Sequence, residues 1–315
     1  MKLAVLEPLG IPDADLRALL EKATADADVE IVTYSDRRED EASLAERSAD
    51  ADIVVVSNIA YPASVMERNP NLKYVCVAFT GFDHVDMAYC RERGIQMSNC
   101  AGYSTVAVAD LVFGLVLDVY RNISTLNEIV RDGGTKDGLV GPELDGKCFG
   151  VIGAGAIGTR VMRIASAFGC EVVAYSRTPK DIPGVTFVDF DELISTSDVI
   201  SLHVPQTPET VGMIGAEQIA KMKPSAVLIN CARGPIVDSE ALATALNGGR
   251  IAGAGIDVLE MEPPFPSDHP LLTSKNTIVT PHVAFASTEA MQKRAEIVAD
   301  NVASYLAGAT KNLVS

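Results

Sequence analysis

Three ionisable side chains in the second half of the chain are of types that could together transfer a proton and bind an anionic group. Arg233 lies in INCARGP, Glu262 in VLEMEPP and His282 in TPHVA, each near the end of an apolar segment. A histidine exchanges protons near neutral pH, a neighbouring carboxylate favours its charged form, and a guanidinium binds carboxylates through paired hydrogen bonds. Taken singly, each also fits a structural role at a helix edge, a loop or a strand end. The presence of all three residues beside a nucleotide-binding site, described next, predicts catalysis.

A glycine pattern near the middle of the chain predicts that nucleotide site. VIGAGAIGTRV places Gly153, Gly155 and Gly158 in G-x-G-x-x-G spacing, between a strand-like and a helix-like segment. The first glycine permits a tight turn, the second lets the backbone approach a pyrophosphate, and the third lets helix and strand pack closely. The start of the helix adds amide donors and a positive dipole end. We therefore expect a bound dinucleotide; a glycine turn without a ligand is the alternative.

The residues after the next strand bear on which dinucleotide is bound. The usual fingerprint has an Asp or Glu about 20 residues further on, where it binds the ribose 2′-hydroxyl. Here EVVAYS ends in Ser176, and Arg177 follows. Serine removes the carboxylate that would repel a 2′-phosphate, Arg177 can add charge-assisted hydrogen bonds, and Lys180 is a further cation nearby. The pattern favours NADP(H). The alternative is that Arg177 is a solvated loop residue and that NAD(H) is bound through other contacts.

The elements that must position these residues alternate along the chain. Short apolar segments precede helical patterns from LAVLE to KYVCVAF, and again from CFGVIG to NTIVTPH. Such repeats predict α/β architecture with parallel sheets covered on both faces. We expect two doubly wound parallel-sheet domains, a Rossmann nucleotide domain and a flavodoxin-like substrate domain, with an interdomain cleft. The expected bounds are 1–98 with 285–315 for the substrate domain and 99–284 for the dinucleotide-binding domain.

Two longer helices are predicted outside these repeats. STVAVADLVFGLVLDVYRNISTLNEIV predicts one helix over residues 104–130, with Ser104 or Thr105 as its N-cap. Its charged residues suit a subunit interface better than a membrane, so a homodimer is expected. The segment 287–308 predicts an amphipathic helix that returns to the first sheet.

Composition disfavours several classes of function. The net charge of −16, from 26 basic and 42 acidic residues, disfavours binding to nucleic acid or anionic membranes. No segment is apolar for long enough to span a membrane, and the N-terminal sequence lacks the features of a signal peptide. The six cysteines include no C-x-x-C pair, and the four histidines are scattered. We expect a cytoplasmic protein with reduced thiols and no metal.

The motifs occur in the order found in one enzyme family. FTGFDHVD and GYSTVAVAD in the first half, then LDGKCFGVIGAGAIG, LHVPQTPET, INCARGPIVD, AGIDVLEMEPP and TPHVA, cover almost the whole chain. They resemble the D-isomer-specific 2-hydroxyacid dehydrogenases, which include glycerate, hydroxypyruvate, phosphoglycerate and D-lactate dehydrogenases. The resemblance implies hydride transfer between NAD(P)H and a small 2-keto acid or D-2-hydroxy acid. Phe285, an aromatic residue after His-x-Ala, favours hydroxypyruvate or glyoxylate as the substrate. The corresponding hydroxy acids are D-glycerate and glycolate.

The resemblance assigns roles to the three ionisable residues. It implies that His282 gives a proton to the carbonyl oxygen during reduction, with Glu262 as its carboxylate partner. It implies that Arg233 binds the substrate carboxylate and polarises the carbonyl. It also implies that the loop AFTGFDHVD cradles the substrate carboxylate with backbone amides, and that an aromatic ring in it shapes the side-chain pocket. The candidates in this loop are Phe79, Thr80, Gly81 and Phe82.

The resemblance also implies a set of positions that line the cofactor. Asp257 matches an aspartate near the nicotinamide, whereas His203 fits a packed strand end equally well. The expected cofactor contacts are Thr105, Gly153, Gly155, Ala156, Ile157, Gly158, Ser176, Arg177, Thr178, His203, Val204, Pro205, Thr210, Cys231, Ala232, Arg233, Asp257, His282 and Ala284.

Three other interpretations of the sequence stay open. A dehydrogenase for bulkier D-2-hydroxy acids would share these motifs. A non-enzymatic dinucleotide sensor built on the same fold would be expected to carry additional interaction segments or tails. A formate-dehydrogenase-like enzyme resembles a Gln–His arrangement, whereas Glu262 here supplies a carboxylate.

Overall fold

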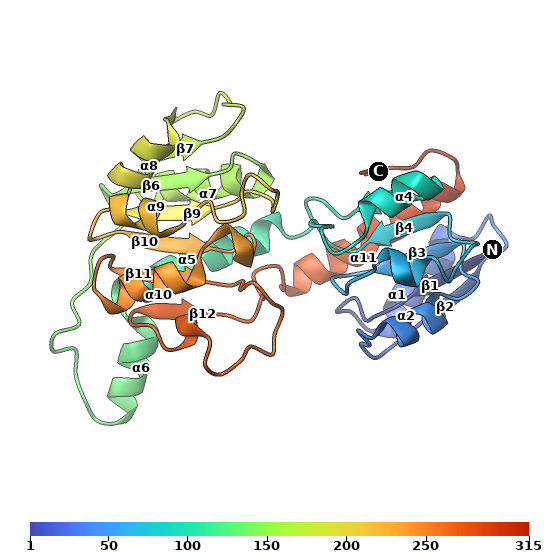
Figure 1. Cartoon of the computed structure of the whole chain (residues 1–315), viewed down its shortest axis with the longest axis horizontal. Helices are drawn as coiled ribbons and strands as arrows, with labels where there is room; N and C mark the ends of the chain where they lie inside the picture. Colours follow the sequence, from blue (N-terminus) through green and yellow to red (C-terminus); the bar gives the residue numbers. More distant parts are fainter. Residues whose placement is uncertain (315) are drawn as a thin grey trace. The chain divides into compact units, whose positions relative to one another are not determined.

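The computed structural model describes residues 1–314 and divides the chain into two compact units (Figure 1). One unit comprises Met1–Ser104 together with the segment from Ala286 onward, and the other comprises Thr105–Phe285. Each unit is a parallel sheet with its own helices. No helix among residues 1–314 is long and apolar enough to cross a membrane.

The first unit is built on a five-stranded parallel sheet in the order β2-β1-β3-β4-β5. Every residue of β3 and β4 is buried, which is why these strands read as continuous apolar runs. The order reverses between β1 and β3, and in open α/β sheets ligands bind at the carboxyl ends of strands beside such a reversal. Its strands are β1 (Lys2–Val5), β2 (Glu30–Thr33), β3 (Ile53–Val56), β4 (Tyr74–Val77) and β5 (Gln96–Asn99).

Side-chain caps fix where several helices of this unit begin. The carboxylates of Asp40 and Asp86 accept hydrogen bonds from backbone amides of the first turns of α2 and α4, and Ser287 does the same for α11. Each cap satisfies an amide that has no partner inside the helix, which typically stabilises it by about 1 kcal/mol. The helices of this unit are α1 (Asp13–Ala23), α2 (Glu41–Ser48), α3 (Ala63–Met66), α4 (Met87–Arg93) and α11 (Thr288–Leu306).

The C-terminal helix α11 packs on α1 and β4 of the first unit, although almost 200 residues separate it from that unit's other elements (Figure 1). Ala290, Val298 and Val302 of its apolar stripe are buried. The ring of Tyr305 stacks on that of Tyr74 in β4, with the ring centroids 4.2 Å apart. The expected amphipathic helix therefore covers the first sheet.

The second unit has seven parallel strands in the order β12-β11-β10-β9-β6-β7-β8. Alternate residues of its strands face two separate apolar cores, as Ile152 and Val151 of β6 show. Both faces are therefore covered, and the predicted class of two doubly wound parallel-sheet domains is confirmed. Its strands are β6 (Cys148–Ile152), β7 (Glu171–Tyr175), β8 (Val185–Phe187), β9 (Val199–Leu202), β10 (Val227–Asn230), β11 (Gly253–Ile256) and β12 (Thr277–Val279). Its helices are α5 (Thr105–Arg121), α6 (Ile123–Arg131), α7 (Ala156–Ala167), α8 (Phe190–Thr196), α9 (Ala216–Lys221) and α10 (Ser239–Asn247), with 3-10 turns η1 (Gly234–Ile236) and η2 (Pro270–Leu272).

The prediction of a single helix over residues 104–130 is wrong, because the segment forms two helices. Asn122 has a left-handed backbone with φ of 52°, a conformation that asparagine tolerates better than most residues. Asp118 accepts hydrogen bonds from the amide and hydroxyl of Ser124, the amide at 2.7 Å, and so stabilises the new helix start. The helix α5 is packed against β10 and β11 of its own unit, whereas no residue of α6 is buried.

Candidate active site

The glycine turn follows β6 at the point where the strand order of the second sheet reverses. Gly153 has φ of 105°, which a residue with a side chain rarely adopts, and a Cβ there would collide with the carbonyl of His203. A Cβ at Gly158 would collide with the carbonyl of Gly153, so the third glycine allows the turn and α7 to touch. At Gly155, where α7 begins, a Cβ would meet nothing within 4 Å. This open, amide-lined helix start fits the pyrophosphate of a dinucleotide.

The end of β7 lies directly against this turn. The amide of Gly153 donates to the carbonyl of Tyr175 at 2.9 Å, which places Ser176 next to the glycines. The ammonium of Lys180 donates to the carbonyl of Ala154 in the turn at 2.6 Å. Three polar or cationic residues, Ser176, Arg177 and Lys180, therefore follow the strand that flanks the cofactor turn.

A second loop, after β9, approaches Arg177. A hydrogen bond from Thr207, and then the charge of Arg177, lower the pKa of Glu209. Thr210 accepts the amide of Thr207 at 2.8 Å and donates to the carbonyl of Pro205 at 2.7 Å, so it holds this loop through its own hydroxyl.

His203 is packed at the end of β9. Its Nε2 lies 2.8 Å from the hydroxyl of Ser201, and burial lowers the pKa of the ring to about 3. The ring is therefore neutral at ordinary pH, and its backbone carbonyl lies against Gly153. This geometry favours the packed strand end over a charged cofactor contact.

Arg233 lies in a turn fixed by Asn230, the last residue of β10. The side chain of Asn230 donates to the carbonyl of Arg233 at 2.9 Å and accepts the amide of Ala232 at 3.0 Å. Sequence reasoning missed Asn230, whose polar side chain at the end of a buried strand was the available signal. Burial, then the charge of Asp257, raise the pKa of the Cys231 thiol well above its usual value, so Cys231 suits a pocket wall and not a nucleophile.

Asp257, fully buried after β11, holds the segment that carries His282. Its carboxylate accepts the hydroxyl of Thr280 at 2.6 Å and the amides of Val283 and Ala284 at 2.9 Å each. The amide of His282 donates to the backbone carbonyl of Asp257 at 2.8 Å. These bonds hold His282 in a left-handed backbone with φ of 55°, which otherwise costs about 1–2 kcal/mol. The sequence indicated Asp257 as a position near the nicotinamide. It did not indicate that Asp257 holds the His282 segment, or that Thr280 takes part.

Glu262 and His282 form a direct pair. The Nδ1 of His282 lies 2.9 and 3.0 Å from the two carboxylate oxygens of Glu262. The histidine side chain is 13% exposed and the carboxylate 49% exposed. Phe285 contacts the imidazole edge-on with ring centroids 5.5 Å apart, and Pro263 restricts the backbone of Glu262. With Nδ1 on the carboxylate, Nε2 is the nitrogen that can exchange a proton with a substrate.

The Arg233 turn and the loop leading to Glu262 touch through their backbones. A Cβ at Gly234 would collide with the carbonyl of Leu259 and the amide of Glu260. Arg233, Asp257 and His282 also follow neighbouring strands β10, β11 and β12, whose carboxyl ends share one edge. The second unit therefore brings the three predicted catalytic residues to one rim, with Glu262 and His282 in contact.

Several other predicted positions lie at the starts of helices or after β4. Ala156 and Ile157 begin α7, and Thr105 begins α5. In the first unit, the candidate substrate loop follows β4: Phe79 is buried against Tyr103, with ring centroids 5.9 Å apart, whereas Thr80, Gly81 and Phe82 are half-buried. Among residues 1–314 no hydrogen bond uses the backbone amides of those last three residues. Residues 1–314 also hold no group of three or more His, Cys, Asp or Glu suited to a metal ion.

Comparison with known proteins places these features in one family. Residues 113–284 match the model of the D-isomer specific 2-hydroxyacid dehydrogenase NAD binding domain. The chain is 37% identical over 281 residues to a hydroxypyruvate reductase of Blautia hydrogenotrophica, covering 85% of this chain and 86% of the relative. It is 42% identical over 256 residues to a glyoxylate reductase of Thermofilum pendens, covering 78% and 75%.

Two solved structures share the whole fold. An acyclic imino acid reductase in complex with NADPH and D-Arg has a TM-score of 0.90 at 32% identity, over 100% of both chains. A D-lactate dehydrogenase from Aquifex aeolicus, complexed with NAD and lactic acid, has a TM-score of 0.84 at 30% identity, over 98% of this chain and 96% of the other. The resemblance drawn from the motifs is confirmed. The chain belongs to the D-isomer-specific 2-hydroxyacid dehydrogenase family of nicotinamide-dependent oxidoreductases.

Proposed function

We propose that this protein reduces a small 2-keto acid, with hydroxypyruvate or glyoxylate as the preferred substrate, to the D-2-hydroxy acid. The observation that carries the proposal is the Glu262–His282 pair, 2.9 Å apart, on the same sheet edge as the Arg233 turn. The relatives named for hydroxypyruvate and glyoxylate support this substrate class.

The residues would divide the reaction between them. A bound nicotinamide supplies the hydride to the carbonyl carbon. His282 would give the proton on Nε2 to the carbonyl oxygen as negative charge builds there, while Glu262 stabilises the imidazolium through Nδ1. Arg233 would bind the substrate carboxylate and polarise the carbonyl. The loop of Thr80, Gly81 and Phe82 in the first unit is a proposed substrate-binding segment, because the backbone amides of these three residues form no hydrogen bond among residues 1–314.

A panel of 2-keto acids tests this proposal. Hydroxypyruvate, glyoxylate, pyruvate and a bulky aromatic keto acid are each followed by NADH and NADPH oxidation. The highest kcat/KM is expected for hydroxypyruvate or glyoxylate. A higher value for the aromatic acid would favour the dehydrogenase for bulky substrates, and no turnover with any acid would favour a dinucleotide sensor.

Reduction of an acyclic imino acid is a second candidate. The observation that favours it is the TM-score of 0.90 to the imino acid reductase. A proton donor at Nε2 of His282 would serve a C=N bond as it serves C=O. Turnover of a keto acid that rises in proportion to added ammonium would support this candidate.

NADP(H) is the proposed cofactor. Ser176 lies where a carboxylate would repel the 2′-phosphate, and Arg177 and Lys180 follow it; the anchor of Lys180 on Ala154 keeps a positive charge at the glycine turn.

Ser176→Asp tests the cofactor directly. We expect the ratio of kcat/KM for NADPH over NADH to fall roughly tenfold to hundredfold, because the new carboxylate repels the 2′-phosphate and accepts ribose hydroxyls. Ser176→Ala removes the hydroxyl without adding charge and serves as the control, with a smaller change. An unchanged ratio in Ser176→Asp would show that the residues after β7 do not select the cofactor.

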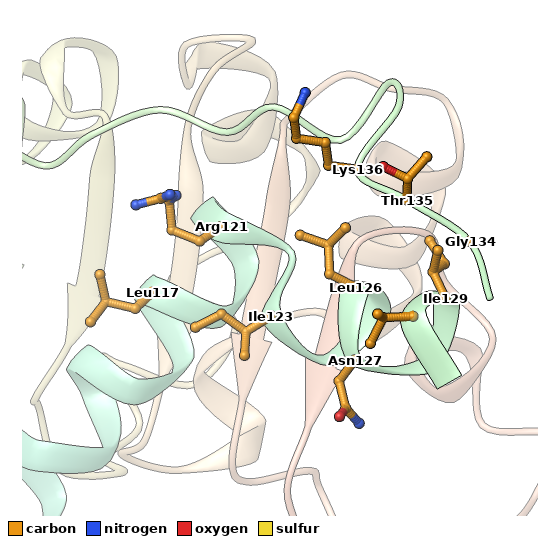
Figure 2. Close-up of a pocket in the computed structure, with 10 residues that line it drawn as sticks. Leu117, Arg121, Ile123, Leu126, Asn127, Ile129, Gly134, Thr135 and Lys136 are labelled. Carbon is orange, nitrogen blue, oxygen red and sulfur yellow. The ribbon is translucent and has the colours of Figure 1, made fainter. Parts of the chain in front are cut away.

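The second unit has an apolar groove on its surface. The groove has a volume of about 870 Å³ and lies between the end of α5, the helix α6 and the segment 134–136 (Figure 2). Ile123 is 53% and Val130 65% exposed, and a nine-residue amphipathic helix such as α6 is not stable alone. The lining residues are Leu117, Arg121, Ile123, Leu126, Asn127, Ile129, Val130, Gly134, Thr135 and Lys136. We propose that two copies bury this face against each other in a two-fold homodimer.

Sedimentation equilibrium tests the dimer. The protein is expected to show twice the 33.3 kDa mass of one chain, and Ile123→Asp combined with Val130→Asp to show a single chain. Val211→Asp, at an exposed valine elsewhere in the same unit, should remain dimeric. A single-chain mass for the unmodified protein at micromolar concentrations would overturn the proposal.

The six cysteines, all free thiols, further support the proposed cytoplasmic location, because a reducing compartment preserves thiols.

A further inference from the structure

Glu262 lies on a loop of the second unit that has no regular structure between β11 and η2. Its carboxylate is 49% exposed, so the hydrogen bonds to His282 do not by themselves bury it. A half-exposed side chain on an irregular loop would ordinarily sample several rotamers. Such sampling slows catalysis, because catalysis depends on exact placement of the reacting groups. Besides Pro263, contacts elsewhere in the loop can restrict the backbone of Glu262.

The carboxylate of Glu260, two residues earlier, joins three parts of the unit. One oxygen accepts the hydroxyl of Ser239, the first residue of α10, at 3.0 Å. The other lies 3.2 Å from Nε2 of His269, at the far end of the loop. The Nδ1 of His269 accepts the amide of Leu271 at 3.3 Å, which leaves Nε2 as the protonated nitrogen that donates to Glu260.

This arrangement ties the loop at both of its ends. His269 is 5% exposed and is packed where η2 begins. The backbone of Glu260 also rests on Gly234, next to Arg233, where no Cβ could fit. The segment 260–269 is therefore closed by a side-chain bridge and fixed to α10, with Glu262 inside the closed segment.

We infer that Glu260, together with Ser239 and His269, is a positioning group that holds the Glu262 carboxylate on His282. The inference rests on the proposed reductase function. Among residues 1–314 the Glu260 carboxylate hydrogen-bonds to Ser239 and His269 and not to His282 or Arg233, so we expect it to act through the loop that carries Glu262. Its loss should reduce kcat and leave the KM for NADPH near its original value.

The experiment is a double-mutant cycle between Glu260→Ala and Glu262→Gln, with Glu240→Ala as the matched control. Glu240 is an exposed carboxylate in the first turn of the same helix α10. Glu260→Ala is expected to lower kcat roughly tenfold to hundredfold, as small misplacements of a catalytic group do, and Glu240→Ala to leave it unchanged. In the Glu262→Gln background, Glu260→Ala should change kcat less than about threefold, because coupled residues do not add.

NADPH binding separates positioning from a purely structural role. Glu260→Ala should lower kcat while the concentration of NADPH-binding sites stays unchanged, as for Glu262→Gln. A loss of folded enzyme would lower the concentration of NADPH-binding sites in proportion to the loss of activity.

Two results would overturn the inference: full activity of Glu260→Ala, or an equal loss of kcat in the Glu262 and Glu262→Gln backgrounds. A failure of the proposed function is distinguishable, because the unmodified protein would then reduce none of the keto acids.

Discussion

His282→Gln is expected to lower kcat for keto-acid reduction roughly hundredfold to ten-thousandfold, the usual contribution of a positioned general acid. Glutamine can still hydrogen-bond to Glu262, but it has no ionisable proton to give to the carbonyl oxygen. The bonds from Asp257 to the amides of Val283 and Ala284 do not involve the imidazole, so the loop should keep its course. Single-turnover and steady-state reduction rates measure the loss.

The pH dependence provides the control for this prediction. In the unmodified protein the rate of reduction should fall as pH rises, because the donor must be the imidazolium. Glu262→Gln removes the carboxylate 2.9 Å from Nδ1 but keeps the imidazole, so it should lower kcat less than His282→Gln does. His282→Gln should remove the fall altogether. NADPH affinity, measured by fluorescence titration, should change little in either variant. A His282→Gln enzyme that keeps both its rate and its pH dependence would show that another group gives the proton.

Arg233→Met is the second substitution with a large expected effect. We expect kcat/KM for the keto acid to fall roughly hundredfold to thousandfold, since loss of one preorganised donor to a developing negative charge costs about 2.7–4 kcal/mol. Arg233→Lys should recover only part of this, because a lysine cannot form the paired bonds of a guanidinium. Asn230 fixes the backbone of the turn independently of the arginine side chain, so the fold should tolerate both variants.

A neutral substrate separates the two functions proposed for Arg233. The methyl ester of the same keto acid has the carbonyl but not the carboxylate. The unmodified protein should strongly prefer the acid, and Arg233→Met should lose most of that preference. If the variant retained the full preference for the acid, the carboxylate would be bound by other groups, and Arg233 would act on the carbonyl alone.

Strands buried on both faces were predictable because burial imposes a local pattern. The run IVVV of β3 and the run VLIN of β10 read directly as apolar segments, and the structure buries every residue in them. The edge strand β8 was not predicted, since its residues are only partly buried or exposed and carry no apolar run. β5, with the sequence QMSN, was also missed, because it carries no apolar run; its buried Ser98 pairs with β4 and donates a hydrogen bond to the C-terminal segment.

The break at Asn122 shows where local pattern misleads. The segment 104–130 has helical apolar spacing throughout, so the spacing alone favours one helix. The break depends on one asparagine in a left-handed conformation and on Asp118, which caps the next helix. Many asparagines with helical neighbours stay in helices, and only the packed structure selects the bend.

By itself the sequence predicted the fold class and the glycine turn and made Arg233, Glu262 and His282 the catalytic candidates, because strand burial and motif spacing are local properties. Tertiary structure alone decided how these residues are held: Asp257 fixing the His282 segment, Asn230 shaping the Arg233 turn, and Glu260 joining Ser239 to His269. Asn230 acts within its own turn. The bonds of Asp257 to the His282 segment and of Ser239 to Glu260 join segments far apart in the sequence, which meet only after the parallel strands have aligned their carboxyl ends. Pairings of that kind follow from strand order, which no local pattern of residues encodes.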